Sequence, residues 1–376
     1  MKPLYRTIVV LLAVVGAAVA SSGAPAAPTA GHVYVNDNTA GTNTVAAFDR
    51  NADGTLTEIA GSPFATGGAG TGHGIGSQGA LQRTSDGRYL LAADAGSNQI
   101  SVLKIKPDGS LQLVDTASSG GIEPVSIAVH DNLVYVANAG DGGSNYTGFT
   151  INAGGDLRPL AGSTVALPDG SQPGDVFFNG TGTILAGTRV NTSLIDSFVV
   201  GRDGRLTAAP GSPFPAQGIG PFGSEFRPTD SSQLFVSNAH NGGNAGTVSA
   251  FSVAGDGALS SIGTSPYPDL QPAPCWVEIS QDGSYLFTVN TAGPSISSYS
   301  IAATGALTLL GSTPFASPVG VGPEDARLSP DGETLFVVDT AADALSAFAV
   351  SGGDLTELAA RTPLPAGAAP FGIVVT

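Results

Sequence analysis

The stretch LFVSNAHNGGNAGTVSAFSVAGDGAL, residues 234–259, contains the pattern that decides the fold. Its first five residues form an apolar run that ends in an asparagine, and residues 247–253 alternate between apolar and polar side chains. Alternation with a period of two is typical of a β-strand with one buried face. The Asp-Gly pair that follows at 256–257 favours a tight turn. The stretch therefore predicts short strands joined by turns and glycine-rich loops.

The same pattern recurs along the chain in seven copies that are about 50 residues apart. The turn, written DGxL, TGAL or GGDL, occurs at 53–56, 108–111, 154–157, 203–206, 256–259, 304–307 and 352–355. The earlier apolar run ends at Asp37, Asp94, Asn138, Thr188, Asn238, Asn290 and Asp339, which we interpret as turn residues that bond local backbone. Each copy has room for four short strands, and four strands in about 40–50 residues are typical of a propeller blade.

One strand in each copy indicates how the ring closes. These expected innermost strands lie at 79–85, 124–129, 173–178, 221–227, 274–280, 323–329 and 370–376. The first copy starts without such a strand, and the last strand has no copy after it. We therefore predict an all-β fold over residues 32–376, a seven-bladed β-propeller with four-stranded blades. The C-terminal strand would complete the first blade and remove the free edges of the ring.

The N-terminal residues have the pattern of a secretory signal peptide. Lys2 and Arg6 precede an apolar run, residues 7–20, that ends in Ala-Val-Ala. The alternative is a membrane anchor, which would need about 20 apolar residues. We predict a signal peptide at 1–20, a flexible leader at 21–31, and a secreted protein without a membrane anchor.

Composition restricts the partners that the protein can have. Charged residues are only 12% of the chain, yet the net charge is −16. An acidic surface argues against nucleic acid and anionic membranes, which both favour lysine and arginine. Cys275 is the only cysteine, so an intrachain disulfide is excluded, and we interpret this residue as a small buried side chain. We expect a monomer that carries no cofactor.

The stretch GPFGSEFRP, residues 220–228, raises the question of a site, because Glu225 and Arg227 lie in an otherwise apolar strand. Arg227 is at the far end of the strand, and we interpret it as structural. The innermost strands alternate, and one face is polar in most copies. This face carries Ser126, Asp175, Gly223, Glu225, Trp276, Glu278, Asp325 and Arg327, and the copy that starts with glycine offers Gln82 with a register uncertain by one residue. A closed ring would bring these residues to its axis.

Two interpretations of this polar face remain open. It could form a mainly acidic pocket that binds a small molecule, either hydroxyl-rich or cationic, with Trp276 as a stacking wall and Arg327 as a partial counter-charge. Its members Asp175, Trp276, Glu278, Asp325, Arg327 and Gln82 would then bind the ligand. Alternatively, the same groups only form hydrogen bonds between blades or hold water in a wet channel.

The histidines are His32, His73, His130 and His240, and none has the spacing of a metal ligand, so we expect no metal site. His73 lies in a glycine-rich loop, residues 67–79, which could cradle an anion or simply connect two blades. His240 follows the expected second strand of the fifth copy. It is the one histidine that we consider as a catalytic candidate.

The repeated LFVxN/D, xSxF, DGxL and GSPF motifs, and stretches such as residues 76–102, resemble the lactonase-type seven-bladed propellers over essentially the whole mature chain. This group includes 6-phosphogluconolactonase-like and carboxymuconate-cyclase-like proteins. The resemblance implies lactone hydrolase activity, with Arg and His in a GPRH stretch and Glu in a later NEL stretch. Here the matching positions read Phe222, Gly223 and Ala239. Glu225 and His240 are the catalytic candidates that remain.

Two functions therefore compete. The first is a secreted lactonase-like hydrolase with an altered site, acting on a lactone or sugar-derived small molecule. The alternative is a non-catalytic extracellular propeller that binds a small molecule, a glycan or a protein through its loops. The family resemblance favours the first, and the missing Arg, His and Glu favour the second.

Overall fold

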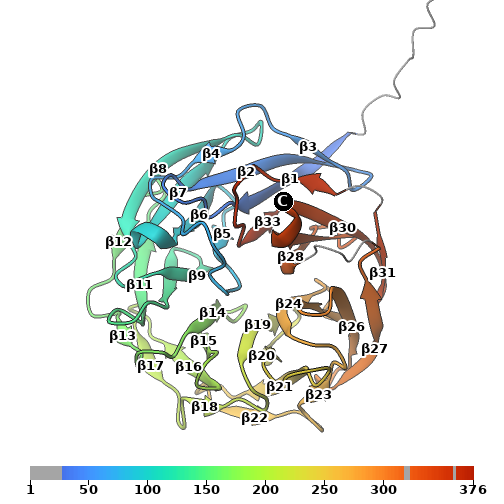
Figure 1. Ribbon diagram of the computed structural model, residues 1–376. Coiled ribbons are helices and arrows are strands. Elements are labelled where there is room, and N and C mark those ends of the chain that lie inside the picture. Colours follow the sequence, from blue (N-terminus) through green and yellow to red (C-terminus); the bar gives the residue numbers. More distant parts are fainter. Residues whose placement is uncertain (1–27, 317–321, 359–360) are drawn as a thin grey trace, which may run out of the picture.

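The computed structural model describes residues 28–316, 322–358 and 361–376, which form seven antiparallel sheets arranged in a ring (Figure 1). This confirms the predicted all-β, seven-bladed β-propeller. The predicted signal peptide, and the leader up to residue 27, lie outside the described residues. The only described helices are two 3-10 turns, η1 (Ala95–Ser97) and η2 (Thr340–Ala342). Within the described residues, no helix is long and apolar enough to cross a membrane.

Each blade has an innermost, a second and a third strand, followed by an outer strand that is divided in five of the seven blades. From blade 1 to blade 7, the innermost strands are β33 (Ile373–Val375), β5 (Leu81–Arg83), β9 (Pro124–His130), β14 (Pro173–Phe178), β19 (Pro221–Arg227), β24 (Pro274–Ile279) and β28 (Pro323–Leu328). The second strands are β1 (Thr29–Asn36), β6 (Tyr89–Asp94), β10 (Leu133–Asn138), β15 (Ile184–Arg189), β20 (Asp230–Asn238), β25 (Tyr285–Asn290) and β29 (Thr334–Asp339).

The third strands, in the same order, are β2 (Thr44–Asn51), β7 (Gln99–Ile105), β11 (Asn145–Ile151), β16 (Leu194–Val200), β21 (Thr247–Val253), β26 (Ser295–Ile301) and β30 (Ala344–Ser351). Blades 2 and 6 have one continuous outer strand each, β8 (Leu111–Ser118) and β27 (Leu307–Pro314). In the other blades the outer edge is divided into two short pieces. These are β3 (Leu56–Glu58) and β4 (Phe64–Ala65), β12 (Leu157–Pro159) and β13 (Val165–Ala166), β17 (Leu206–Ala208) and β18 (Phe214–Pro215), β22 (Leu259–Ser261) and β23 (Tyr267–Pro268), and β31 (Asp354–Glu357) and β32 (Thr362–Pro363).

The ring closes as predicted, because the C-terminal strand β33 pairs with β1 in blade 1. In this antiparallel ladder Ile373 faces Val35 and Val375 faces Val33. The strand β1 already begins at Thr29, which pairs with Asn51, so it includes the last three residues of the segment predicted as a leader. The backbone of these residues is ordered by the β2 ladder, a pairing that their small side chains do not reveal.

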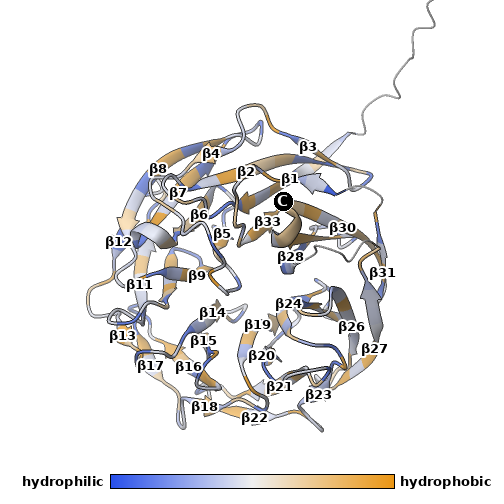
Figure 2. Ribbon diagram, viewed as in Figure 1, coloured by the Kyte–Doolittle hydropathy of each residue, from blue (hydrophilic) through white to orange (hydrophobic). Residues whose placement is uncertain are grey.

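The core consists of apolar layers between neighbouring blades, and Figure 2 shows hydrophobic segments along the strands of the whole ring. Val136, Phe235 and Leu335 from second strands are all completely buried. Tyrosine hydroxyls add bonds between blades, since Tyr34 Oη donates to the Gly109 carbonyl at 2.9 Å and Tyr135 Oη to the Gly204 carbonyl at 2.8 Å. Each blade therefore depends on its neighbours for burial of its faces.

The two ends of the ring differ in construction. We call the side at which the innermost strands begin the entry face, and it carries loops such as 139–144 and 239–246. We call the opposite side the turn face, because it carries the tight turns between first and second strands, for example 84–88, 130–132 and 280–284. Side chains of the innermost strands lie between these two faces.

Candidate functional site

The polar face of the innermost strands lies on the ring axis in two tiers. The ladders place Ser126, Asp175, Gly223, Trp276 and Asp325 in an upper tier, nearer the entry face. They place Gln82, Glu225, Glu278 and Arg327 in a lower tier, nearer the turn face. The sequence left the register of Gln82 uncertain by one residue, and its pairing opposite Leu91 resolves this.

Asp175 connects three blades in the upper tier. Its Oδ2 accepts hydrogen bonds from the backbone N–H of Ser224 at 2.9 Å and from the Ser224 hydroxyl at 2.7 Å. Its Oδ1 accepts one from the Ser126 hydroxyl at 3.1 Å. Ser126 Oγ in turn accepts a bond from the Val176 N–H in the next blade, also at 3.1 Å. The carboxylate is therefore held by residues of blades 3 and 5 while its own strand belongs to blade 4.

The lower tier repeats this arrangement one step nearer the turn face. Glu225 Oε2 accepts from the Ile279 N–H at 2.7 Å, and Glu278 Oε1 accepts from the Leu328 N–H at 2.8 Å. The second oxygen of Glu278 forms an ion pair with Arg327 Nη1 at 3.0 Å. Each acid thus bonds to the innermost strand of the following blade.

These bonds have a common physical cause. The innermost strand of each blade has one unpaired edge, whose N–H groups point toward the axis and need acceptors. Side chains from the preceding blade provide those acceptors. The axial acids therefore bond between blades, as one of the two interpretations of the sequence expects, while their role in ligand binding stays a proposal.

A loop segment enters the ring at the level of the upper tier, and we call residues 75–79 the axial plug. The Ser77 hydroxyl donates to the Val125 carbonyl at 2.6 Å, and the Gln78 N–H donates to the Gly174 carbonyl at 2.9 Å. The Gly79 N–H reaches Asp325 Oδ2 at 3.3 Å. The glycine-rich loop, for which we considered an anion cradle or a simple connection, is thus anchored across the ring.

Gln78 is the axial residue that sequence reasoning missed. Its Oε1 accepts from the Val277 N–H at 2.9 Å, and its Nε2 donates to the Ser224 carbonyl at 3.3 Å. By analogy with Ser126 and Asp175, the acceptor for the Val277 N–H would come from position 223. That residue is a glycine, and the carboxamide of Gln78 takes its place.

The space at position 223 is fully occupied by neighbouring atoms. A Cβ added to Gly223 would lie 2.2 Å from Gln78 Oε1 and 2.8 Å from the Cys275 carbonyl oxygen. Both separations are far below contact distance. The histidine that the family resemblance expects at this position therefore has no room in this structure. Gly223 and Gly372 both lack a side chain at this position of the repeated strand, and such gaps are the sequence signal that could have indicated that another segment enters the axis.

An aromatic cluster closes the axis on the entry side. Trp276 is 3% exposed, and its ring centroid lies 5.1 Å from Phe222 and 6.3 Å from Phe371. Its indole N–H donates to the Ser77 carbonyl at 2.9 Å, which ties the cluster to the plug. Phe222, at the position where the resemblance expects Arg, is thus a packing residue.

Burial changes the protonation of the axial acids. Desolvation raises the pKa of Asp175 and of Glu278 to about 7 and that of Asp325 to about 6. Burial, and then the nearby Glu278, raise the pKa of Glu225 well above its ordinary value. Although burial opposes its charge, Arg327 keeps a raised pKa because Glu278 and Asp325 surround it. Four carboxyl groups thus share one guanidinium, and some of these carboxyl groups remain protonated at neutral pH.

The structure does not bring the two catalytic candidates together. His240 is exposed on the entry face, where its backbone N–H bonds to the Ile219 carbonyl and its ring lies against Gly220. Glu225 is five residues farther along β19, roughly 16 Å at the usual rise of a strand. Ala239, where the resemblance expects Glu, is 4% exposed and bonds through its N–H to the Gly220 carbonyl.

Arg227 is structural, as the sequence indicates. Its Nε donates to the Gly283 carbonyl and its Nη1 to the Ala302 carbonyl, both at 2.9 Å, so it connects blade 5 to blade 6. Glu225 and Arg227 therefore do not form a catalytic pair. Among the described residues, no group of three or more His, Cys, Asp or Glu side chains could hold a metal ion.

The polar residues that end the second strands are buried, and several bond to the third strand. Asn238 Nδ2 donates to Ser249 Oγ and Asn290 Nδ2 to Ser297 Oγ, both at 2.9 Å. The interpretation of the whole set as residues that bond backbone therefore holds only in part. Asp339 Oδ1 accepts from the Gly322 N–H at 2.9 Å and Asn138 Nδ2 donates to the Ser119 carbonyl at 3.2 Å, whereas Asn238 and Asn290 bond mainly to side chains. They satisfy polar side chains inside the blade, which alternation alone does not distinguish from a turn.

Comparison with known proteins agrees with this architecture. A family model described as "Lactonase, 7-bladed beta-propeller" matches residues 27–178 and 226–374. The unmatched interval, 179–225, includes Phe222 and Gly223, the positions where the resemblance expects polar site residues. No curated protein has a sequence that matches this chain significantly.

Several solved structures share the fold at low sequence identity. A Bacteroides uniformis protein provisionally assigned as a 6-phosphogluconolactonase is 19% identical over 91% of this chain and 98% of its own, with a TM-score of 0.73. The periplasmic gluconolactonase PpgL of Pseudomonas aeruginosa is 18% identical over 92% of this chain and 98% of its own, with a TM-score of 0.71. A functionally unknown protein of Desulfotomaculum acetoxidans is 15% identical over 92% and 98%, with a TM-score of 0.70. At these identities the likeness shows the fold alone.

Proposed function

Because this chain belongs to the seven-bladed lactonase propeller family, we propose that it is a non-catalytic member, exported from the cell, that binds ligands through its loop-rich faces. The observation that carries this proposal is the filled position at Gly223. A lactone-opening site needs an acid or base and a group that stabilises the oxyanion. The positions where the resemblance expects such groups hold Phe222, Gly223 and Ala239, and Gln78 of the axial plug occupies the space beside Gly223.

Export and oligomeric state belong to the same proposal. The signal-peptide pattern of residues 1–20 supports secretion, and the low content of charged residues with a net charge of −16 supports a partner that is not an anionic polymer. We expect the mature protein to be a monomer, because β33 closes the ring on β1 within one chain and every blade packs between two neighbours of that chain. Size-exclusion chromatography with light scattering would test this expectation.

Family membership favours lactone hydrolysis as the second candidate function. Glu225 could then act as a general acid, since burial raises its pKa well above the ordinary value. A substrate would have to approach from the turn face, past Arg327, whose side chain is 20% exposed. Asp175, Glu278, Asp325, Trp276 and Gln82 would be the ligand-binding residues of that site.

A hydrolysis assay separates the two functions. We expect glucono-δ-lactone to open at the uncatalysed rate in the presence of the mature protein, and chelator to make no difference. Glu225→Gln, which keeps the acceptor for the Ile279 N–H, and His240→Ala should behave like the unaltered protein. Saturable turnover that Glu225→Gln abolishes would overturn the proposal in favour of the hydrolase.

A further inference from the structure

Three cavities on the turn face have the same construction. Each lies between two neighbouring blades and is lined by the first turn of both blades and by the end of the third strand of the later one. They occur between blades 2 and 3, blades 3 and 4, and blades 6 and 7, with volumes of about 260, 290 and 310 Å³. None of their lining residues belongs to the axial tiers. The repeat thus provides equivalent hollows on one side of the ring.

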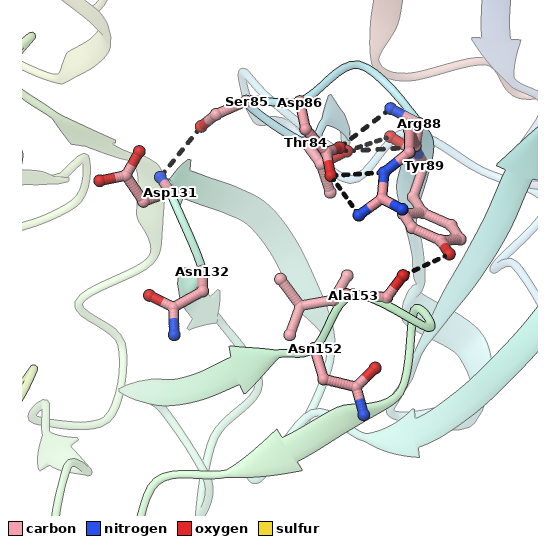
Figure 3. Close-up of a pocket in the computed structure, with 10 residues that line it drawn as sticks. Thr84, Ser85, Asp86, Arg88, Tyr89, Asp131, Asn132, Asn152 and Ala153 are labelled. Carbon is pink, nitrogen blue, oxygen red and sulfur yellow. Dashed lines mark hydrogen bonds and ion pairs between the residues drawn. The ribbon is translucent and has the colours of Figure 1, made fainter.

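The cavity between blades 2 and 3, which we call the 2/3 crevice, has an apolar floor. Figure 3 shows Tyr89 on one side, Ala153 below it, and Asp131 and Asn132 on the opposite side. Ile151 completes the floor. The Tyr89 hydroxyl donates to the Ala153 carbonyl at 3.1 Å, so the two blades are fixed relative to one another at this point.

The rim of the 2/3 crevice is polar and held in place. Arg88 bonds to Asp86 through Nε at 2.6 Å and lies over the Tyr89 ring at 5.5 Å. The backbone N–H of Asp131 donates to Ser85 Oγ at 2.9 Å, and its carboxylate, which is 80% exposed, lies with Oδ2 3.7 Å from His130 Nε2. Asn132 is exposed, and its backbone carbonyl accepts a bond from the Ile151 N–H at 2.9 Å. These bonds fix the backbone of the rim, so the ordering that a ligand must bring about is limited to the exposed side chains.

The chemistry of these groups defines the ligand. Arg88 and Asp86 neutralise one another, which leaves the negative Asp131 and the uncharged Asn132 at the rim. A carboxylate accepts hydrogen bonds and a carboxamide both donates and accepts them, so together they suit adjacent hydroxyl groups. The apolar floor suits the C–H face of a ring, and the volume suits one ring rather than a long chain. An anionic ligand would be repelled by Asp131 and by the acidic protein as a whole.

We propose that the 2/3 crevice binds a single uncharged pyranose unit of a glycan. This inference rests on the proposed non-catalytic binding function and assigns to it a site and a ligand class. The related cavities keep an apolar floor, with Leu133 and Val200 in one and Tyr285 and Val350 in the other. Sites that face the same way on one rigid ring would act together on a branched or polymeric glycan, because the second contact is intramolecular.

Saturation-transfer NMR with simple sugars tests the inference directly. The probes are methyl α-D-glucopyranoside, methyl α-D-mannopyranoside and methyl β-D-galactopyranoside, added to the full mature protein. We expect at least one of these sugars to bind with a dissociation constant of about 1 mM, which is typical of a single weak contact. Asn132→Ala should weaken this binding about tenfold, the effect of losing one to two hydrogen bonds. Ala153→Phe, which fills the floor, should abolish it.

Controls separate the crevice from the rest of the surface. Asn191→Ala removes an exposed asparagine on the entry face and should leave binding unchanged. Thermal unfolding of each variant verifies that the ring is intact. The inference is overturned if no pyranoside binds at ten times the expected dissociation constant, or if Asn132→Ala and Ala153→Phe bind as well as the unaltered protein. Stronger binding of glucuronic acid than of the methyl glucoside would overturn the choice of an uncharged ligand.

The lactone assay keeps the two proposals distinguishable. If no pyranoside binds and no lactone is turned over, the proposal of a sugar site in the 2/3 crevice is wrong. The non-catalytic assignment then still holds. Lactone turnover that depends on Glu225 overturns the non-catalytic assignment, whatever the sugars do. Because the crevice shares no residue with the axis, variants in one do not alter the other.

Discussion

Gly223 and Gln78 show how a single missing side chain is compensated on the axis. Upper-tier residues such as Asp175 accept a bond from the next innermost strand, and Gly223 has no atom that could do so. A loop 145 residues earlier in the chain supplies the carboxamide of Gln78 instead. A buried N–H without an acceptor would cost about 1–3 kcal/mol, so this replacement stabilises the junction between blades 5 and 6.

The first prediction concerns this pair. Gly223→Ala should reduce the free energy of unfolding by about 1–3 kcal/mol, because the added methyl group overlaps Gln78 Oε1 and the Cys275 carbonyl. Urea unfolding followed by circular dichroism measures the change. Gly255→Ala is the matched control, since a Cβ at that glycine meets nothing within 4 Å.

A double-mutant cycle identifies the cause. Gln78→Ala removes the atom nearest to the added Cβ, so the cost of Gly223→Ala should be smaller in the Gln78→Ala background. An equal cost in both backgrounds would show that the overlap with Gln78 does not decide the stability of this position.

At the scale of elements, the innermost strands follow the predicted intervals closely in blades 3 to 7 and less closely in blades 1 and 2, next to the point where the ring closes. β33 spans Ile373–Val375 and β5 spans Leu81–Arg83, whereas the sequence indicated 370–376 and 79–85. Gly372 has a φ of 88° and Gly79 a φ of 83°, so the chain bends out of the ladder before each strand. These two glycines allow the start of β33 to lie close to the start of β5, since a Cβ at Gly372 would lie 2.4 Å from the Leu81 nitrogen.

The second prediction concerns the closing strand. Ile373 is completely buried and pairs with Val35, so Ile373→Ala should lower the free energy of unfolding by about 2–5 kcal/mol through the cavity it leaves. Leu113→Ala, on the outer strand β8 with 43% exposure, should change it by less than about 0.5 kcal/mol. Denaturant titration of both variants checks this contrast, and similar values for the two would mean that β33 contributes little to ring closure.

At the scale of the whole molecule, acids divide into two populations with opposite effects on stability. The axial acids have raised pKa values because they are buried. Exposed acids in the turns, such as Asp53 and Asp108, have lowered pKa values because they accept bonds from Thr55 and Ser110 in their own turns. The first population favours the folded state in acid, and the second favours it above the ordinary pKa of an aspartate.

The third prediction is the resulting pH profile. Between about pH 4, the ordinary value for an aspartate, and about pH 7, the folded protein binds more protons than the unfolded chain, because Asp175 and Glu278 titrate near 7. Stability should therefore fall as the pH rises through this window. Stability should also decrease as the pH drops below about 4, because the turn carboxylates then take up protons. Urea midpoints between pH 3 and pH 9 measure the profile.

Variants assign the two limbs of the profile. Asp175→Asn, which keeps an acceptor for the Ser224 N–H, should flatten the slope between about pH 4 and pH 7. Asp53→Asn should leave that slope unchanged and affect only the acidic limb. A profile that rises steadily from pH 5 to pH 8 would contradict the assignment of the axial acids as partly protonated groups.

The sequence by itself determined the blade count, the strand order and the closure of the ring. Period-two alternation and a repeated turn are local features, and each strand bears its own pattern, so seven copies and an unmatched last strand are enough to define the circle. Alternation also identified the axial face, including Glu225 and Arg327, because side-chain direction along a strand is fixed by the backbone.

Only the tertiary structure decided what that face does. Whether Asp175 and Glu225 meet a ligand or a backbone N–H depends on the neighbouring blade, and whether Gly223 leaves an open space depends on a loop from another part of the chain. Contacts between residues far apart in sequence are not recorded in any local pattern. The axial plug and the turn-face crevices arise from such contacts, and they distinguish this ring from the family pattern that its repeats share.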